Sequence, residues 1–399
     1  MKAGGAIAFA RFMQLALYCP VYGYYEKEED RIGRHGDYYT SVSVGRLFGE
    51  LLAFQFAQWL ESESKRETGA VQIVEAGAHD GRLAKDILTW LREHRPKLFH
   101  QLEYWIVEPS PTRQQWQQQT LAEFSTQTRF VTELGIPSPV PHLSRRLAAP
   151  KSDEGGSQAK ADSPLVHGII FANELLDAMP VHRLGWDAKT WKWFEWGVTL
   201  SEGQFVWKRM EDGEKPEVRG QKSEVRGQKP AHWGIPELPK ALLDVLPDGF
   251  TVELCPARTE WWRQAASALK RGKLLTIDYG LEADEFFAPE RKEGTLRAYC
   301  RHQLTCNVLA DPGEQDITAH VNFTAIQAAG EAAGLKTDGF LTQAQFLTAI
   351  AAQIWNGGAS FGEWGSERAR QFQTLTHPEH LGRAFRVLVQ SRASTKSGG

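Results

Sequence analysis

The sequence predicts an α/β protein built on a doubly wound sheet, with a helical extension at its N-terminus and a β-rich insertion. Short apolar runs rich in β-formers alternate with segments of helical periodicity. Several of these runs end in polar residues, and the first is followed by a small-residue turn that leads into a helix. The six candidate strands are 71–75, 103–108, 129–131, 167–172, 273–278 and 384–390.

The composition excludes several classes of protein. The 399 residues are 42% hydrophobic and 24% charged, which is typical of a globular chain that buries a sizeable core. A formal net charge of -3 gives no overall attraction to nucleic acid, and no run of about 18 apolar residues predicts membrane insertion. The four cysteines lack CxxC spacing, so we expect no metal site, no disulfide framework and a cytoplasmic location.

Residues 1–60 are expected to form a helical region. Its apolar residues recur at helical spacing at Phe9, Phe12, Met13, Ala16 and Leu17. Arg11 and Gln14 interrupt the apolar run, so we interpret the segment as an amphipathic helix that packs on the core rather than as a secretion signal.

The first candidate strand ends at Glu75 and passes into a turn that predicts a nucleotide site. Gly77, Ala78 and Gly81 allow the backbone to turn tightly beside a ligand before helical spacing resumes. We expect Glu75 and these three residues to bind a cofactor that contains a nucleoside.

Glu108 follows the second candidate strand, 27 positions after Gly81. An acid there can accept hydrogen bonds from two ribose hydroxyls, and the alternative is a solvated strand end. The turn lacks the G-x-G-x-x-G spacing that holds a pyrophosphate, which disfavours a dinucleotide. A sulfonium cofactor has no phosphate, and Glu75 and Asp80 can supply acids for its aminoacyl end.

Other polar residues are expected at the same edge of the sheet. Ligands bind beyond the carboxyl ends of strands in an open parallel sheet, which brings Asn173, Glu174 and Asp278 toward Glu75 and Glu108. Among these, we expect Asn173 to contact the cofactor.

Residues 181–249 form the predicted insertion. Up to residue 210 it alternates apolar and polar residues around many tryptophans, which predicts a β-meander. Its aromatic face could pack as the core of a small sheet, cover the mouth of the site or contact a protein substrate. The hexapeptide EVRGQK, at 217–222 and again at 224–229, predicts a duplicated flexible surface loop.

Nine short motifs, taken together, resemble the MidA-like, mitochondrial complex I assembly factor-type family of class I S-adenosylmethionine-dependent methyltransferases. In chain order they are GYY from 23, GDYYTS from 36, FGELLA from 48, EAGAHDGRLA from 75, VEPSPTRQQ from 107, NELLDAMPVHR from 173, DYG from 278, GTLRAY from 294 and GEQDITAHVNF from 313. The resemblance covers nearly the whole chain.

The resemblance implies a Rossmann-like methyltransferase core over 61–180 and 250–399, with S-adenosylmethionine as cofactor. It also implies that Gly36, Asp37 and Thr40 of the GDYYT loop contact this cofactor. Mitochondrial members are associated with arginine methylation of a respiratory-complex subunit. We therefore expect methyl transfer to a protein arginine by in-line displacement, and a homodimer is compatible with the sequence.

Three residues are the candidates for catalysis. Paired carboxylates can orient a guanidinium, and Glu174 and Asp177 would face the same way if a helix began at Leu175. The alternative for Asp177 is that it caps or braces a loop. His320 is a candidate hydrogen-bonding group or base on the acceptor side, with an ordinary structural histidine as the alternative.

His79 departs from the family, because it replaces the middle glycine of the turn. Its side chain could obstruct the methionine end of the cofactor, or point away if the backbone is not left-handed. This residue supports the alternative function, a noncatalytic assembly or scaffolding factor with a degenerate methyltransferase fold. A dinucleotide-dependent oxidoreductase is disfavoured by the missing pyrophosphate turn.

Overall fold

The computed structural model describes residues 5–27, 40–64, 70–133, 165–210, 233, 235–300, 303–305, 307–357 and 361–393. Gly36, Asp37 and both copies of EVRGQK lie outside these ranges. Among the described helices, none has both the length and the apolarity that crossing a membrane requires.

The main sheet has the mixed α/β topology that the alternating pattern predicts. Its strands follow the order β15 (Lys336–Thr342), β16 (Phe385–Arg392), β10 (Leu269–Leu281), β5 (Val166–Asn173), β2 (Val71–Ala76), β3 (Leu102–Val107) and β4 (Thr128–Val131), with β14 (Val321–Asn322) also paired to β10. The strands from β10 to β4 run parallel, whereas β16 is antiparallel to both of its neighbours. The carboxyl ends of β2, β3, β5 and β10 therefore meet at one edge.

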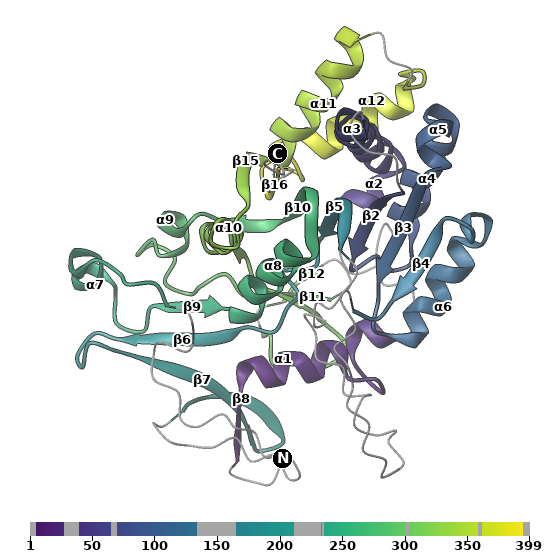
Figure 1. Cartoon of the computed structure of the whole chain (residues 1–399). Helices are drawn as coiled ribbons and strands as arrows, with labels where there is room; N and C mark the ends of the chain where they lie inside the picture. The colour runs from purple at the N-terminus through teal and green to yellow at the C-terminus, as the bar shows by residue number, and fades with distance from the viewer. Residues whose placement is uncertain are drawn as a thin grey trace, which may run out of the picture.

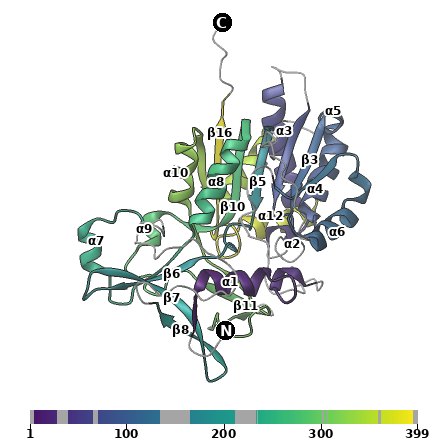
Figure 2. The same cartoon turned by 60° about the horizontal axis from the view of Figure 1, so that its bottom comes forward.

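Each face of this sheet is covered by helices because side chains alternate along the strands. Ile73 and Phe171 face a core formed with α3 (Leu47–Ser64), α4 (Arg82–His94), α11 (Gln343–Gly357) and α12 (Ser366–Thr376). Val74 and Ile170, the adjacent residues, face a second core with α8 (Pro256–Ala268) and α10 (Phe323–Ala332). The two layers of helices lie on either side of the sheet in Figure 2.

The insertion forms an antiparallel sheet that also includes a strand from the N-terminal region and one that directly follows the insertion. Its order is β1 (Ala6–Ala8), β7 (Lys192–Ser201), β6 (His182–Asp187) and β9 (Thr251–Leu254), with β8 (Gln204–Arg209) paired to β7. The aromatic side chains serve mainly as packing: Trp186 is 2% exposed in a core with Phe250. Trp191, at 47% exposure, is the exception on this sheet.

Helix α1 (Phe9–Tyr18) joins the two parts of the molecule. The apolar residues that predict it, Phe9, Phe12 and Met13 among them, are buried against Val198 of β7 and Ile317. Ile317 belongs to a small sheet of β12 (Gln303–Leu304), β11 (Arg297–Cys300) and β13 (Asp316–Thr318). Figure 1 shows α1 and the insertion sheet below the main sheet, at the end where β2, β3 and β5 terminate.

The remaining elements are short or peripheral. They are η1 (Tyr24–Glu26), α2 (Ser41–Val44), α5 (Pro96–Phe99), α6 (Pro111–Thr120), η2 (Ala122–Phe124), α7 (Lys240–Val245) and α9 (Ala283–Phe286). Of these, η1, α2 and α6 contribute residues to the cavity at the edge of the main sheet where the strands end, and so bear on the site.

A buried hydrogen-bond network fixes the antiparallel edge of the main sheet. Trp262 of α8 donates from Nε1 to Oε1 of Gln390 in β16 at 2.7 Å, and both side chains are fully buried. Gln390 in turn donates from Nε2 to the carbonyl of Gln327 and to Oγ1 of Thr337, each at 2.9 Å. One side chain thus ties together α8, β16, α10 and β15.

We predict that Trp262→Phe lowers the free energy of unfolding by about 1–3 kcal/mol, because it leaves a buried Gln390 oxygen without its donor. Urea denaturation measures the loss. The matched control is Trp355→Phe, since Trp355 is 57% exposed and should tolerate the change. Equal losses in the two variants would contradict a special role for this network.

Candidate active site

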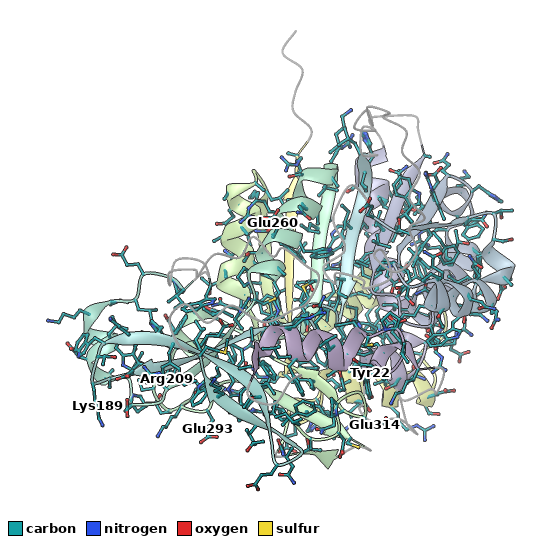
Figure 3. The ribbon with its side chains drawn as sticks, turned by 90° about the horizontal axis from the view of Figure 1, so that it is seen from below. Tyr22, Lys189, Arg209, Glu260, Glu293 and Glu314 are labelled. Carbon is teal, nitrogen blue, oxygen red and sulfur yellow. The ribbon has the colours of Figure 1, made fainter. Side chains whose placement is uncertain are left out.

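A cavity lies at the carboxyl ends of β2, β3 and β5, and the N-terminal segment closes its other side. It is lined by Tyr18, Tyr25, Glu26, Thr40, Val42, Ser43, Glu75–Asp80, Arg82, Leu83, Val107–Pro109, Arg113, Asn173–Leu175 and Ala178. Figure 3, which views the molecule from below, shows α1 crossing in front of this region, with Tyr22 just beyond the helix and Glu314 nearby.

The structure brings together most of the site residues that the sequence predicts. Seven of them line the cavity: Thr40, Glu75, Gly77, Ala78, Glu108, Asn173 and Glu174. Gly81, Asp177 and His320 lie outside the lining. The described residues contain no group of three or more His, Cys, Asp or Glu side chains that could hold a metal ion.

Three alternate residues of the turn after β2 have a left-handed backbone conformation. Gly77 has φ 79°, His79 has φ 47° and Gly81 has φ 85°. A Cβ atom at Gly77 would lie 2.9 Å from Cδ1 of Leu175, so both conformation and space require glycine there. Gly81 supplies the left-handed residue before α4, and its amide donates to the carbonyl of Ala78 at 2.7 Å.

His79 keeps the backbone shape that a glycine would adopt. Its left-handed conformation costs an L-residue about 1–2 kcal/mol. The ring lines the cavity, its side chain is 33% exposed, and Nδ1 lies 3.7 Å from Oδ1 of Asp80. The carbonyl of His79 accepts a hydrogen bond from Nε2 of Gln117 at 2.9 Å, which helps to hold the turn.

Glu75 is a buried acid at the end of β2. It is 2% exposed and accepts a hydrogen bond from the hydroxyl of Tyr104 at 2.6 Å. Burial raises the pKa of Glu75 to about 7, and the bond from Tyr104 offsets part of this shift. A cation in the cavity would favour the ionised carboxylate.

Glu108 is held by two hydrogen bonds but keeps further acceptor capacity. Its Oε1 accepts from the amide of Ser110 at 2.9 Å, and its Oε2 accepts from Nε2 of Gln117 at 3.1 Å. A carboxylate offers about four lone-pair positions, so each oxygen can accept one more donor. Glu108 is 3% exposed, and the alternative of a solvated strand end does not hold.

The opposite wall comes from the chain after α1 and from α6, and its residues are not among the predicted site residues. Glu26 accepts from the hydroxyl of Ser110 through Oε2 at 2.9 Å, whereas its buried Oε1 has no partner. Arg113 donates from Nε and Nη2 to the carbonyl of Tyr25 at 3.1 and 3.0 Å, and its guanidinium lies over the Tyr25 ring. These contacts join residues 84 and 88 positions apart in the chain, and the GYY and VEPSPTRQQ motifs mark the two segments.

Glu174 is the most unusual acid in the cavity. It has φ 50°, so it occupies the left-handed region although it is not glycine. Its Oε1 accepts from the amide of Ser41 at 3.3 Å and from Nδ2 of Asn173 at 3.2 Å, whereas its Oε2 is buried without a partner. Burial, and then the nearby Asp177, raise the pKa of Glu174 to about 8.

Ser41 links Glu174 to a distant helix. Its hydroxyl donates to Oε1 of Gln343 at 3.0 Å, and Nε2 of Gln343 donates to the carbonyl of Leu375 in α12 at 3.0 Å. Ser41 and Gln343 are both fully buried. The short helix α2 is therefore fixed between the cavity and α12.

Asp177 lies in a turn and does not line the cavity. Residues 175–179 form a turn and not the helix that would place Glu174 and Asp177 on one face. The reason is that the amides of Leu175, Leu176 and Asp177 donate to Oδ2 of Asp278 instead of starting a helical ladder. Asp177 nevertheless remains close enough to raise the pKa of Glu174.

Asp177, Asp278 and Asp316 complete a buried acid cluster beside Glu174. Burial raises the pKa of Asp177 to about 6 and raises that of Asp278 well above its ordinary value. Asp316 accepts a hydrogen bond from the hydroxyl of Tyr25 at 2.5 Å and also raises the pKa of Glu174. This cluster of four carboxyl groups, Glu174 with these three aspartates, is called the acid cluster below.

His320 lies outside the cavity lining, at the segment that follows β13. Burial, together with Arg297, Arg291 and Arg258, lowers the pKa of His320 to about 4. The imidazole is therefore neutral near pH 7 and a weak base. Its backbone amide donates to Oγ1 of Thr295 at 3.2 Å, and its Nδ1 is buried without a partner.

Comparisons with known proteins agree with this geometry. A family model described as "Putative S-adenosyl-L-methionine-dependent methyltransferase" matches residues 51–341. The mitochondrial protein arginine methyltransferase NDUFAF7 of Xenopus laevis is 28% identical over 374 residues, which cover 89% of this chain and 73% of the relative. That of Homo sapiens is 27% identical over 368 residues, covering 89% and 72%.

A solved structure is similar over nearly the whole chain. It is a Burkholderia thailandensis protein bound to S-adenosyl-homocysteine, with 28% sequence identity and a TM-score of 0.72. The similarity covers 98% of this chain and 88% of that one.

The names of the relatives contradict the expected cytoplasmic location. The curated relatives from Xenopus laevis, Drosophila melanogaster and Homo sapiens are all named mitochondrial. The expectation rested largely on cysteine usage, and Cys19, Cys255 and Cys300 are indeed free thiols. Free thiols report a reducing environment, but they do not identify the compartment.

We predict that His79→Gly raises the free energy of unfolding by about 1 kcal/mol, because relief of the left-handed strain outweighs the added freedom of the unfolded chain. Gly77→Ala should lower it by at least about 1 kcal/mol through strain and contact with Leu175. Chemical denaturation measures both changes. His100→Gly is the matched control, since His100 has φ -70° and gains nothing from glycine. A destabilised His79→Gly variant would show that the histidine side chain itself holds the turn.

Proposed function

Because the chain belongs to the S-adenosyl-L-methionine-dependent methyltransferase family whose model matches residues 51–341, we propose that it transfers a methyl group to an arginine side chain of a protein substrate. The observation that carries the proposal is the acid cluster. Glu174 lies in it with one buried carboxylate oxygen that has no partner, at the wall of the cavity.

The cavity fits S-adenosylmethionine through groups whose hydrogen-bonding capacity is unused. Glu108 can accept from the ribose hydroxyls, and Asn173 has a buried Oδ1 without a partner that can accept from the amino group. Glu75 supplies a carboxylate that a positive charge would ionise, and Gly77 leaves the space that a Cβ atom would fill. When bound, the cofactor supplies an electrophilic methyl group on a sulfonium.

The remaining cofactor contacts stay predictions. Thr40 and Ala78 line the same cavity, whereas Gly81 acts on it by shaping the turn. Gly36 and Asp37 are proposed from the sequence resemblance alone. His79 is left-handed and lines the cavity, so the condition under which its side chain would point away is not met, and its effect on cofactor binding stays a prediction.

The acid cluster suits a guanidinium. An arginine side chain carries a delocalised positive charge and five N–H donors, and the buried Oε2 of Glu174 can accept one of them. Asp177 and Asp316 add negative potential from behind Glu174. A strained residue with a high pKa in a cavity is typical of functional sites, because such strain persists only where the surrounding structure enforces it.

Glu174 can also receive the proton that methylation releases. A guanidinium nitrogen that gains a carbon must give up one proton for the product to keep a single positive charge. Burial raises the pKa of Glu174 to about 8, so its carboxylate is a stronger base than an exposed glutamate. His320 is a weaker candidate for this role, because its pKa is lowered to about 4.

The relatives give independent support for the acceptor. They are named protein arginine methyltransferases, and the chain covers 73% of the Xenopus laevis relative. We propose a respiratory-complex subunit as the substrate on the sequence resemblance, and a homodimer likewise stays a prediction.

The function is tested by incubating the protein with methyl-labelled S-adenosylmethionine and extract from cells that lack it. We predict labelled methylarginine in hydrolysed protein, and a loss of about 100-fold or more in Glu174→Gln, which removes the charge that holds the guanidinium. Glu202→Gln is the matched control, because Glu202 has φ 49° but is exposed in the insertion. Label confined to small molecules or to other amino acids would overturn the proposal.

Activity should rise with pH. The deprotonated acids bind the cation, and their pKa values, raised to about 8 for Glu174 and about 6 for Asp177, leave Glu174 largely neutral and Asp177 about half ionised at pH 6. We predict that kcat/KM for methyl incorporation increases about tenfold or more from pH 6 to pH 8 and then levels off. Return from pH 6 to pH 8 should restore the rate, and a flat profile would exclude ionisation of these groups as a requirement.

The same raised pKa values determine whether stability rises or falls with pH. In the unfolded chain these carboxyl groups ionise near pH 4, well before they do in the folded protein. The free energy of unfolding of the unliganded protein should therefore fall as the pH rises from about 4 to about 8. Denaturation midpoints across this range measure the trend.

A further inference from the structure

Arg258 is a buried guanidinium that the proposed reaction does not use directly. It lies in the first turn of α8, just after β9 of the insertion sheet, and is 4% exposed. Its Nε donates to the carbonyl of Leu176 at 2.6 Å, and its Nη2 donates to the carbonyl of Asp177 at 3.1 Å. The same group also donates to a second segment, from Nη2 to Ala319 at 2.9 Å and from Nη1 to His320 at 2.8 Å.

The turn that carries Asp177 is held from two sides by opposite charges. The carboxylate of Asp278 accepts hydrogen bonds from the amides of Leu175, Leu176 and Asp177, whereas Arg258 binds the carbonyls of the last two. A short turn without a helical ladder leaves such backbone groups unpaired, and buried backbone groups need partners. Both faces of the turn are thereby fixed directly after Glu174.

The second segment follows Asp316, another member of the acid cluster. Its residue Ala319 donates from the amide to the carbonyl of Asp177 at 3.0 Å, so the two segments also touch directly. Arg258 thus spans 174–178 and 316–320, which are far apart in the sequence and carry three of the four acids. Asp278, the fourth acid, accepts hydrogen bonds from the amides of the turn.

We infer that Arg258 is a positioning residue, which holds the acid cluster in the arrangement that binds the acceptor guanidinium. This inference rests on the proposed function for its catalytic consequence, but its structural part stands without it. The planar guanidinium of Arg258 binds four backbone carbonyls. A lysine ammonium is a compact charge that cannot reproduce this arrangement. The guanidinium binds the carbonyl side of the turn, and Oε2 of Glu174 remains without a partner and can accept from the substrate.

The charge of Arg258 acts on the same acids. It counters the effect of burial on the pKa of Asp177 and of Asp278, so it helps these groups to ionise. The effect of losing the positive charge can therefore be separated from the effect of losing the planar guanidinium. Arg258→Lys keeps a positive charge without the fork, and Arg258→Met removes both.

Hydrogen exchange tests the structural part. In Arg258→Lys we expect the amides of 174–178 and of 316–320 to exchange faster together, by about tenfold or more, because both lose the same anchor. Arg392→Lys is the matched control: Arg392 donates from Nη2 to the carbonyls of Ala266 and Ala333 at 3.0 and 2.8 Å, away from the cavity. Faster exchange in one segment only, or evenly over the whole molecule, would overturn the inference.

Ligand binding and kinetics test the catalytic part. Calorimetry with S-adenosyl-homocysteine should give a Kd within about threefold of the original protein, while kcat for methyl incorporation falls about 100-fold in Arg258→Lys. Arg258→Met should in addition move the rise of kcat/KM to higher pH, and Arg392→Lys should leave the rate and the pH profile unchanged. An unshifted profile in Arg258→Met, or an equal loss of rate in Arg392→Lys, would show a merely structural arginine.

If the unaltered protein incorporates no methyl group, the proposed function fails while the exchange experiment still decides the role of Arg258. If methylation proceeds and the two segments do not loosen together, the positioning role fails alone.

Discussion

The burial of carboxyl groups at the carboxyl edge of the main sheet is the constraint on which the site depends. Water no longer solvates Glu75 and Glu174, and the pKa values of these two acids rise as a result. Such a cluster is tolerated only if backbone amides, a buried arginine and the parallel strands hold it in place. Asp278 is an example. Its carboxylate accepts hydrogen bonds from three backbone amides that do not begin a helix.

The sequence alone predicts much of this arrangement, for a physical reason. Parallel strands end at one edge of a sheet, so acids and amides that follow apolar runs must gather there. Glu75, Glu108, Asn173 and Glu174 all line the cavity as that rule requires. Alternation along the strands also separates the two layers of helices, since adjacent residues such as Ile73 and Val74 face different cores.

The rest depends on contacts that no local pattern records. Glu26 reaches the cavity because the chain after α1 folds back onto the segment that follows β3. The segment 175–179 forms a turn and not a helix because the carboxylate of Asp278, far along the chain, accepts hydrogen bonds from its amides. The conformation of His79 is likewise set by its neighbours, since sequence favours glycine but does not enforce it. The location of the protein is a different matter, because no contact in the fold encodes it.

The pairing of β1 with β7 has a consequence for the order in which the molecule is assembled. Ala6, Ile7 and Ala8 pair with residues 197–199, so β1 cannot pair until β7, far along the chain, has been made. The last strand, β16, then inserts between β10 and β15. Folds dominated by such distant pairings form slowly, and their unpaired edges stay exposed to other chains meanwhile. The cavity draws its lining from residues between Tyr18 and Ala178, so the site cannot be complete until this stretch has been made and the N-terminal segment has packed against it.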